Sequence, residues 1–266
     1  MNVRGVSTSS AAAIGMVAVH WPAPERVRSF CSTRIGGISE APFDALNLST
    51  ASGDSPRHVS ENISRLCHAA NLPHRPIWPH QVHGIDAVDA DTLTDDTEAD
   101  AVFTNKYERL CAVRTADCLP VLLCDRRATT VAAAHAGWRG LAAGVLESTI
   151  DAMPCRANQL LAWLGPAIGP QAYEVGPEVR AEFTKQNPQS DAAFKLSRTT
   201  EPADTNATPR WLADLYELAR RRLRAYGVTD IYGGDFCTLS DSARFFSYRR
   251  DGVTGRMASG IWLAAD

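Results

Sequence analysis

RTADCLPVLLCDRRATTVAAAHAGWRG, residues 114–140, is the stretch that decides the fold of this chain. It contains two apolar runs, 120–125 and 130–137, and the polar residues between them predict the turn of a β-hairpin. Cys118 and His135 are equally distant from the centre of that turn, so an unbulged antiparallel pairing places them opposite each other. Directly opposed Cβ atoms are about 4.5–5.5 Å apart. A thiol and an imidazole that close suit either a shared metal ion or a nucleophile with its base.

The residues after the hairpin, GWRG at 137–140, predict the entrance of a helix. Free N–H groups at a helix start attract phosphate, and Arg139 adds a permanent charge suited to oxyanions. A structural role is equally consistent, with Trp138 in the core and Arg139 at the surface. Arg34 lies in a glycine-rich loop after a strand predicted over 27–32. Arg34 could likewise bind an anion or simply belong to an ordinary turn, and the residues alone favour the turn.

Composition and charge exclude several classes of protein. The chain has 266 residues, 45% of them hydrophobic, which is enough for one large domain or two tightly joined ones. Lys and Arg (27) nearly balance Asp and Glu (30), so the chain lacks the basic footprint of a nucleic-acid binder. Seven cysteines without a CxxC pair indicate a reducing compartment, the cytoplasm, and no apolar run reaches transmembrane length.

Strand and helix signals are clustered along the chain and do not alternate regularly. We expect strands over residues 27–32, 101–104, 110–114, 120–125, 130–137, 160–164, 231–232, 245–248 and 261–263. We expect helices over residues 56–70, 141–153, 177–185 and 211–226, the last being the longest. Residues 186–208 are polar and predict the loosest part of the chain. This order favours an α+β fold, with β-sheet layers flanked by helices, over a doubly wound parallel sheet.

A third ligand for a metal ion is available from the close histidine pair His80 and His83. In an extended chain these two side chains point to opposite faces, so at most one enters a shared site. The predicted closeness of Cys118 and His135 is what raises His83 above an ordinary histidine. One thiolate and two imidazoles on Zn²⁺ leave a fourth position for water or substrate, as in catalytic zinc sites. A metal-free Cys118–His135 pair stays open as the alternative.

Two familiar metal enzymes can be tested by their missing motifs. Zinc nucleobase deaminases carry the motifs H-x-E and P-C-x-x-C, and neither is present here. Pro154-Cys155 begins the second motif, but no second cysteine follows at the required spacing. Multicopper oxidases use repeated His-x-His pairs, and the seven histidines here form none. Two histidines and a cysteine could hold copper, but a trinuclear cluster has too few ligands.

Several longer motifs are specific enough to identify a family. QVHG (81–84), TADCLPVL (115–122) and AHAGWRG (134–140) strongly resemble the YfiH family, also called the multicopper polyphenol oxidase or laccase-domain family. Its members are now regarded as purine nucleoside phosphorylases. Further matches are STRIGG (32–37), NLS (47–49) with GD (53–54), LGPAIGP (164–170) and FFSYRR (245–250). The resemblance covers residues 27–263.

This resemblance implies a single domain over residues 1–266, of which 1–20 are loosely ordered. The implied fold is the mixed α/β one shared with bacterial deamidating toxins and long classed with cysteine hydrolases. His83, Cys118 and His135 would be the ligands of Zn²⁺, with Cu²⁺ as a second candidate, and Cys118 and His135 would also be catalytic. Arg34, Asn47 and Arg139 would contact substrate or phosphate.

The implied activity is phosphorolysis of adenosine, inosine or guanosine to the free base and ribose 1-phosphate. Adenosine deamination and methylthioadenosine phosphorolysis are implied at the same site. The partners are then a purine nucleoside and phosphate, without nucleic acid or membrane, in a monomer or weak homo-oligomer. Two alternatives remain: a hydrolase that edits peptidoglycan precursors with the same zinc or Cys118, and a copper-dependent polyphenol oxidase.

Two positions modify these expectations. Ile63 stands where members of the family often have arginine, which would weaken phosphate binding if that arginine contacts substrate. Asp117 is adjacent to Cys118, but in a strand it faces the other way, so we expect no catalytic role for it.

Overall fold

The computed structural model describes residues 13–197 and 208–265. The strands are β1 Val27–Cys31, β2 Ala87–Asp89, β3 Ala101–Thr104, β4 Cys111–Thr115, β5 Leu119–Asp125, β6 Val131–Ala136, β7 Leu160–Leu164, β8 Glu174–Val175, β9 Phe194–Leu196, β10 Trp211–Ala213, β11 Asp230–Gly233 and β12 Met257–Leu263. The α-helices are α1 Pro56–Ala69, α2 Trp138–Ala143, α3 Val145–Ala152, α4 Pro177–Gln186, α5 Leu215–Ala225 and α6 Tyr248–Asp251. Short 3₁₀ helices are η1 Thr50–Ser52, η2 Ala157–Gln159 and η3 Pro188–Ala193.

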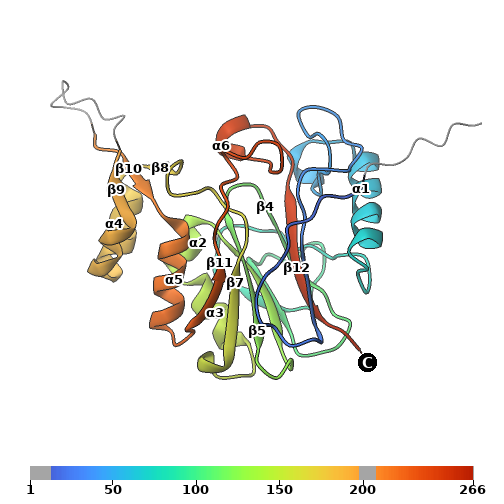
Figure 1. Ribbon diagram of the computed structural model, residues 1–266, viewed down its shortest axis with the longest axis horizontal. Helices are drawn as coiled ribbons and strands as arrows, with labels where there is room; N and C mark the ends of the chain where they lie inside the picture. Colours follow the sequence, from blue (N-terminus) through green and yellow to red (C-terminus); the bar gives the residue numbers. More distant parts are fainter. Residues whose placement is uncertain (1–12, 198–207, 266) are drawn as a thin grey trace, which may run out of the picture.

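Two sheets pack face to face and helices cover their outer faces (Figure 1). The larger sheet has the order β11-β7-β5-β6-β3-β2, and the smaller has the order β1-β12-β4. Alternate residues of β5 serve two cores: Val121 packs toward α3 and α5, whereas Leu122 packs toward the smaller sheet. On the other face of the smaller sheet, Ala258 packs with Leu66 of α1. The predicted α+β class, with sheet layers flanked by helices, is confirmed.

A third sheet, β8-β10-β9, lies beside α4 (Figure 1). It was not predicted, because its strands have two or three residues each and lack a measurable alternation. Part of it falls in the segment predicted to be loose. Residues 198–207 lie outside the described residues, whereas residues 188–196 form η3 and β9.

The β5–β6 hairpin is confirmed, but its register differs from the prediction by two residues. Pro120 lies opposite His135, and Cys118 comes directly before β5. A slip of one residue would have moved Cys118 to the other face of the sheet, whereas a slip of two keeps it on the same face. Cys118 and His135 are therefore diagonal neighbours at the open end of the hairpin and not a directly opposed pair.

Two helix predictions need correction. The helix expected over 141–153 begins at Trp138 and is interrupted at Gly144, whose φ of 114° ends α2. The helix expected over 211–226 begins at Leu215, because the Asp214 side chain caps it by accepting a hydrogen bond from the Glu217 N–H. It has 11 residues and is shorter than α1, which has 14.

The strand expected over 245–248 is also wrong, since Ser247 caps the short helix α6 there. At the other end of the chain, part of the N-terminal segment predicted to be loose packs on β1. Residues 1–12 lie outside the described residues. Val17 is buried, and its N–H donates to the carbonyl of Cys31 at 2.8 Å. Among the described helices, none is long and apolar enough to cross a membrane.

Candidate active site

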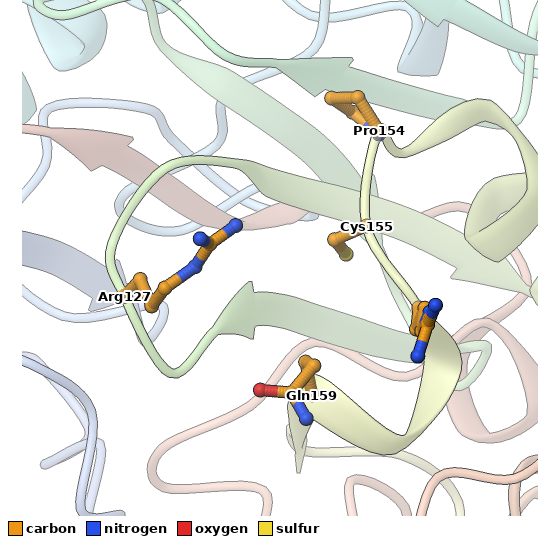
Figure 2. A pocket seen from close by; sticks show the side chains of 5 residues that line it. Arg127, Pro154, Cys155 and Gln159 are labelled. Carbon is orange, nitrogen blue, oxygen red and sulfur yellow. The ribbon is translucent and has the colours of Figure 1, made fainter.

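A cavity of about 550 Å³ lies near the turn of the β5–β6 hairpin (Figure 2). Its wall consists of Arg127, Pro154, Cys155, Arg156 and Gln159. Burial raises the pKa of the Cys155 thiol to about 11, so this cysteine stays protonated at neutral pH and is a poor nucleophile. Because no predicted site residue lines this cavity, we place the candidate active site elsewhere.

A larger cavity, of about 680 Å³, contains the predicted metal ligands His83, Cys118 and His135. Arg139, another predicted site residue, also lines it. Its remaining wall is rich in cationic and aromatic side chains, namely Arg114, Arg249, Arg256, Trp138, Tyr173 and Tyr248. The tertiary structure thus brings together four of the six side chains that the sequence analysis singled out.

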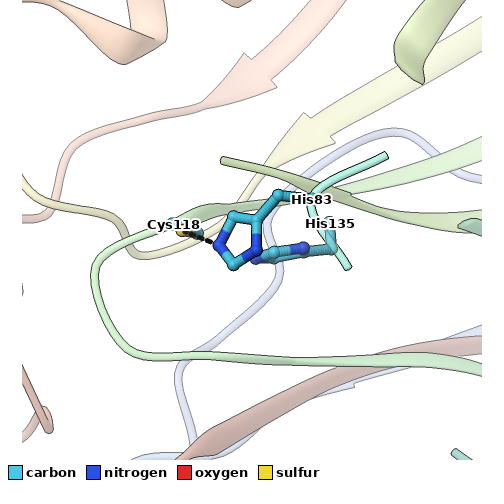
Figure 3. A group of neighbouring side chains, drawn as sticks. All are labelled: His83, Cys118 and His135. Atoms are coloured by element: carbon cyan, nitrogen blue, oxygen red, sulfur yellow. Dashed lines mark hydrogen bonds between the residues drawn. The ribbon is translucent and has the colours of Figure 1, made fainter. Parts of the chain in front are cut away.

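The three predicted ligands point toward one another (Figure 3). Their donor atoms all lie within 4.8 Å of one another, and Cys118 Sγ is 3.8 Å from His83 Nε2. Two ligands of one tetrahedral zinc ion, at ordinary Zn–S and Zn–N lengths, are roughly 3.5 Å apart. The group can therefore bind a metal ion with little movement. His83 contributes to it, while His80 is exposed and lies 3.9 Å from Glu98.

Asp100 orients His135, and the sequence analysis missed this residue. Its fully buried carboxylate lies 2.7 Å from His135 Nδ1, and its carbonyl accepts a hydrogen bond from the His135 N–H at 2.7 Å. A carboxylate at Nδ1 holds the proton there and leaves Nε2 free for the metal. Asp100 is the last residue of an acidic and polar stretch, 86–100, which gives no local sign of a buried role.

Asp100 also holds the loop that carries His83. Its carboxylate accepts hydrogen bonds from three successive backbone N–H groups, those of Val82 (3.1 Å), His83 (3.1 Å) and Gly84 (2.6 Å). His83 has φ 61°, in the left-handed region that is uncommon for residues other than glycine. One carboxylate therefore fixes two of the three metal ligands, and it compensates for the strained backbone of the second.

Gly137 and Gly140 of the GWRG motif make room for this arrangement. A Cβ on Gly137 would lie 2.8 Å from His83 Cδ2 and 3.0 Å from Cys118 Sγ. A Cβ on Gly140 would lie 2.7 Å from the Gly84 carbonyl. The distances of 2.8 and 2.7 Å are too short for a Cβ contact, so glycine at these positions lets α2 lie close to the candidate metal ligands.

In the metal-free protein, neighbouring charges shift the pKa values of Cys118 and His135. Burial alone would raise the pKa of the Cys118 thiol, but the neighbouring His135 and His83 outweigh burial and hold it well below the ordinary value. Burial would lower the pKa of His135, but the Cys118 thiolate and the Asp100 carboxylate hold it above the ordinary value. Cys118 is thus a thiolate stabilised by an imidazolium, ready to bind a metal.

Four arginines line the cavity, and only Arg139 was predicted to do so. Arg139 is exposed, and its guanidinium lies 4.5 Å from the centre of the Trp138 ring. Arg249 is exposed and lines the cavity, whereas the adjacent Arg250 pairs with Asp251 at 2.8 Å. Arg114 and Arg256 were missed because they stand alone in strand-like sequence.

Arg34 and Asn47, two further predicted contacts, are not part of the cavity wall. The guanidinium of Arg34 is occupied: its Nε donates to the Asp44 carbonyl at 2.7 Å and its Cζ lies 4.7 Å from the Phe246 ring centre. Asn47 is fully buried, and its Nδ2 donates to Asp54 Oδ2 at 3.0 Å. Both residues hold loops in place, and neither reaches the cavity directly.

The family model described as multi-copper polyphenol oxidoreductase laccase matches residues 28–264. The chain belongs to this family. It is 51% identical over 252 residues to purine nucleoside phosphorylase YfiH of Escherichia coli (strain K12), covering 93% of this chain and 98% of that protein. It is 53% identical over 244 residues to a purine nucleoside phosphorylase of Pseudomonas aeruginosa, covering 91% and 96%.

Solved structures of the same family have the same fold. The crystal structure of a Neisseria meningitidis protein, NMB0706, superposes with a TM-score of 0.86 at 44% identity, covering 94% of this chain and all of that one. YlmD of Geobacillus stearothermophilus has a TM-score of 0.82 at 30% identity, covering 94% and 97%.

The name of the family refers to several copper ions, but the described part of this chain holds a single three-residue group of side chains that could bind a metal, His83, Cys118 and His135.

The departure from the family pattern at Ile63 does not affect the cavity. Ile63 is buried in the core between α1 and the smaller sheet, together with Phe30 and Leu46.

Asp117 lines the cavity, but the reason given for discounting it was wrong. It lies before β5 with φ 88° and not in a strand. Its carboxylate accepts hydrogen bonds from Thr238 Oγ1 at 2.5 Å, Ser247 Oγ at 3.0 Å and the Arg249 N–H at 2.7 Å. These bonds tie α6 to the end of the hairpin, and they explain why a buried carboxylate stands beside the metal ligands.

Proposed function

We propose that this protein is a zinc-dependent purine nucleoside phosphorylase. It transfers the ribosyl group of adenosine, inosine or guanosine to phosphate: the C1′–N9 bond breaks and a bond from C1′ to a phosphate oxygen forms. The observation that carries this proposal is the likeness to relatives named for that activity, at 51% and 53% identity over more than nine-tenths of the chain. Location in the cytoplasm and a monomeric or weakly oligomeric state stay predictions.

The cavity has the chemistry that these two substrates need. Phosphate is an anion, and four arginine side chains without a carboxylate partner among the described residues line the wall. A purine is a flat aromatic ring, and Trp138, Tyr173 and Tyr248 offer aromatic faces in the same cavity. Tyr248 is 61% exposed at the mouth, so it can close over a bound base without displacing core residues.

The metal site fits a soft or borderline ion. His83, Cys118 and His135 would hold it, and a thiolate with two imidazoles favours zinc or copper over magnesium or calcium. When bound, such an ion supplies concentrated positive charge to the cavity. Asp100 keeps the Nδ1 proton of His135 away from the ligand atom, and Gly137 leaves space for the ligands.

The proposal includes adenosine deamination and methylthioadenosine phosphorolysis at the same site. Deamination requires proton transfers, and Asp117, the one carboxylate of the cavity wall, is engaged by three hydrogen bonds. We therefore expect ammonia release from adenosine to be slower than release of adenine. Parallel assays of ammonia and adenine from one reaction measure the ratio.

Turnover of inosine with and without phosphate tests the main proposal. We expect hypoxanthine and ribose 1-phosphate in equal amounts, and no hypoxanthine when phosphate is omitted. Turnover that needs no phosphate would overturn the phosphorylase and favour a hydrolase, for which peptidoglycan precursors are the next substrates to assay. Oxidation of a phenol by copper-loaded protein would favour the oxidase.

Variants separate the metal from a cysteine nucleophile. Cys118→Ser should lose both zinc and activity, and Cys155→Ser, in the other cavity, is the matched control that should keep both. Retention of zinc with complete loss of activity in Cys118→Ser would favour Cys118 as a nucleophile. Metal content by mass spectrometry accompanies each assay.

A further inference from the structure

Arg114 and Arg256 lie side by side on one face of the smaller sheet. Arg114 belongs to β4 and pairs with Ala258 of β12, and Arg256 directly precedes β12. Since side chains alternate along a strand, Arg256 and Arg114 are diagonal neighbours on the same face. Both line the cavity that contains the metal ligands.

These two cations are held close together. Neither has a carboxylate within ion-pair distance among the residues that the structure describes. Burial and the neighbouring Arg256 lower the pKa of Arg114 to about 10, so Arg114 stays charged at neutral pH. Burial also lowers the pKa of Arg256, although the Cys118 thiolate and the Asp117 carboxylate act in the opposite direction. Two half-buried like charges repel each other, and an anion between them would remove that cost.

Each guanidinium is anchored at one nitrogen only. Arg114 Nη1 donates to the Leu48 carbonyl (3.5 Å) and to Ser49 Oγ (3.3 Å). Arg256 Nη1 donates to the carbonyls of Thr254 (2.9 Å) and Gly255 (3.0 Å). In the described residues, the Nε and Nη2 atoms of both side chains have no acceptor. That edge is the fork with which arginine binds two oxygens of a phosphate.

Asn47 couples the two arginines. Its Oδ1 accepts a hydrogen bond from the Arg256 N–H at 2.9 Å. The next residue, Leu48, donates its N–H to the Arg256 carbonyl (3.1 Å) and accepts from Arg114 through its own carbonyl. A buried loop therefore fixes the spacing of the pair. Asn47, predicted to contact substrate, is instead a positioning residue for the two side chains that can.

All four arginines of the cavity lie near aromatic rings: Arg114 Cζ is 5.2 Å from the ring centre of Trp78, and Arg256 Cζ is 5.9 Å from that of Tyr248. The other two arginines differ from this pair in how they are anchored. Arg139 is exposed and lies over Trp138, at the start of a helix of only six residues. Arg249 donates through Nη1 to the Glu174 carbonyl at 2.6 Å, and its Cζ lies 5.2 Å from the Tyr173 ring centre. Both lie against the rings, Trp138 and Tyr173, beside which a purine would lie.

We propose that phosphate binds between Arg114 and Arg256, on the wall formed by the smaller sheet, and not at the start of α2 beside Arg139. The identity of the anion rests on the proposed phosphorolysis, whereas the anion site itself rests on the paired, singly anchored guanidinium groups. The purine base then lies beside Trp138 and Tyr173, in the same cavity as the candidate metal ligands.

Kinetics on the zinc-loaded enzyme test this assignment with inosine and inorganic phosphate. Arg114→Gln and Arg256→Gln should each raise the KM for phosphate by about 10- to 100-fold, since each removes charged hydrogen bonds, and should leave the KM for inosine within about threefold. Arg139→Gln should leave the KM for phosphate within about threefold. Arg156→Gln, in the other cavity, is the control and should change neither constant.

Arg114→Lys controls for a folding defect, because lysine keeps the positive charge but cannot donate two parallel hydrogen bonds to one phosphate. It should raise the KM for phosphate, with an unchanged zinc content and thermal midpoint. A large rise for Arg139→Gln without one for the Arg114 and Arg256 variants would overturn the assignment.

Calorimetric titration of inorganic phosphate into the same proteins, without nucleoside, separates this proposal from the proposed function. Loss of phosphate binding in both variants supports the anion site even if the wild-type protein turns over no inosine. Phosphate-dependent turnover with unchanged phosphate binding in both variants would keep the phosphorylase and overturn the site.

Discussion

At the scale of single residues, Asp100 has more influence on the metal centre than its place in an acidic stretch indicates. It accepts hydrogen bonds from the backbone on both sides of His83 and holds Nδ1 of His135. A carboxylate in this role orients the ligands and raises their basicity. The pKa of Asp100 itself is lowered, because the bonds from His135 and the loop outweigh the effect of burial.

Asp100→Asn should therefore weaken metal binding. An amide has one acceptor oxygen and turns an N–H₂ group toward the backbone donors, so we expect the zinc affinity to fall by about 10- to 100-fold. Competition with a chelating dye measures this without reference to activity. Asp96→Asn, exposed in the same stretch, is the control, and equal affinities in the two variants would contradict the assigned role.

The metal-free protein should contain the Cys118 thiolate at neutral pH. A group whose pKa is lowered by neighbouring cations is ionised above that pKa and protonated as the pH falls through it. Burial raises the pKa of Cys31 and of Cys124 to about 12, so these thiols contribute no signal, whereas burial of Cys237 is outweighed by hydrogen bonds that lower its pKa. Ultraviolet thiolate absorbance of the zinc-free protein against pH measures this. Cys118→Ser should lower the absorbance at pH 7, and an absorbance equal to that of the unsubstituted protein would contradict the assignment.

At the scale of elements, the break between α2 and α3 allows α2 to lie beside the candidate metal ligands. Gly144 ends α2 in the left-handed region with φ 114° and at the same time begins α3. This turn lets α2 stay short and keeps Gly137 and Gly140 against the His83 loop. A continuous helix over 138–152 would align α2 with α3 and would not allow α2 its own direction toward the His83 loop.

Gly144→Ala should destabilise the protein by about 1 kcal/mol. The cause is the backbone conformation alone, since a Cβ at this position would be 3.6 Å from the nearest atom, Arg222 Nη2, an ordinary contact. Urea denaturation of the zinc-free protein gives the free energy of unfolding. Gly252, with φ 68° and open space around it, is a second site at which the same substitution isolates the backbone cost.

At the scale of the whole molecule, the active site lies where the two packed sheets meet the helical layer. Its residues come from η1 and the residue before it, from the loop before β2, from the end of β4 and the β4–β5 loop, and from β6, α2 and α6. Further residues come from the loop after β7 and from the position before β12. The packing of one sheet on the other therefore determines the distance between the metal ligands and the Arg114–Arg256 pair.

Leu122→Ala tests the core between the sheets. Leu122 is fully buried at the centre of β5, and its truncation should cost about 3 kcal/mol of unfolding free energy. Denaturation is measured without zinc, because a bound metal adds stability of its own. Leu196→Ala, at a side chain that is 59% exposed, should change the free energy by less than about 0.5 kcal/mol.

Local patterns predicted the central elements correctly, and the three candidate metal ligands lie together as expected. The hairpin and the flanking apolar strands are long enough for side-chain alternation to be read, and alternation alone places Cys118 and His135 on one face. The two-residue error in the predicted register left Cys118 and His135 on the same face, because side chains alternate with a period of two residues. Helix boundaries at Gly144 and Leu215 were missed because capping there depends on one residue each.

The sequence by itself determined the α+β class, the hairpin and the three candidate ligands, because these follow from periodicity and from the chemistry of a few residues. Only the tertiary structure showed that Asp100 holds two of those ligands, that Arg34 and Asn47 lie away from the cavity, and that Arg114 and Arg256 form a pair. The physical reason is sequence separation. Arg114 and Arg256 meet through the pairing of β4 with β12, and no local pattern specifies which distant strands will pair.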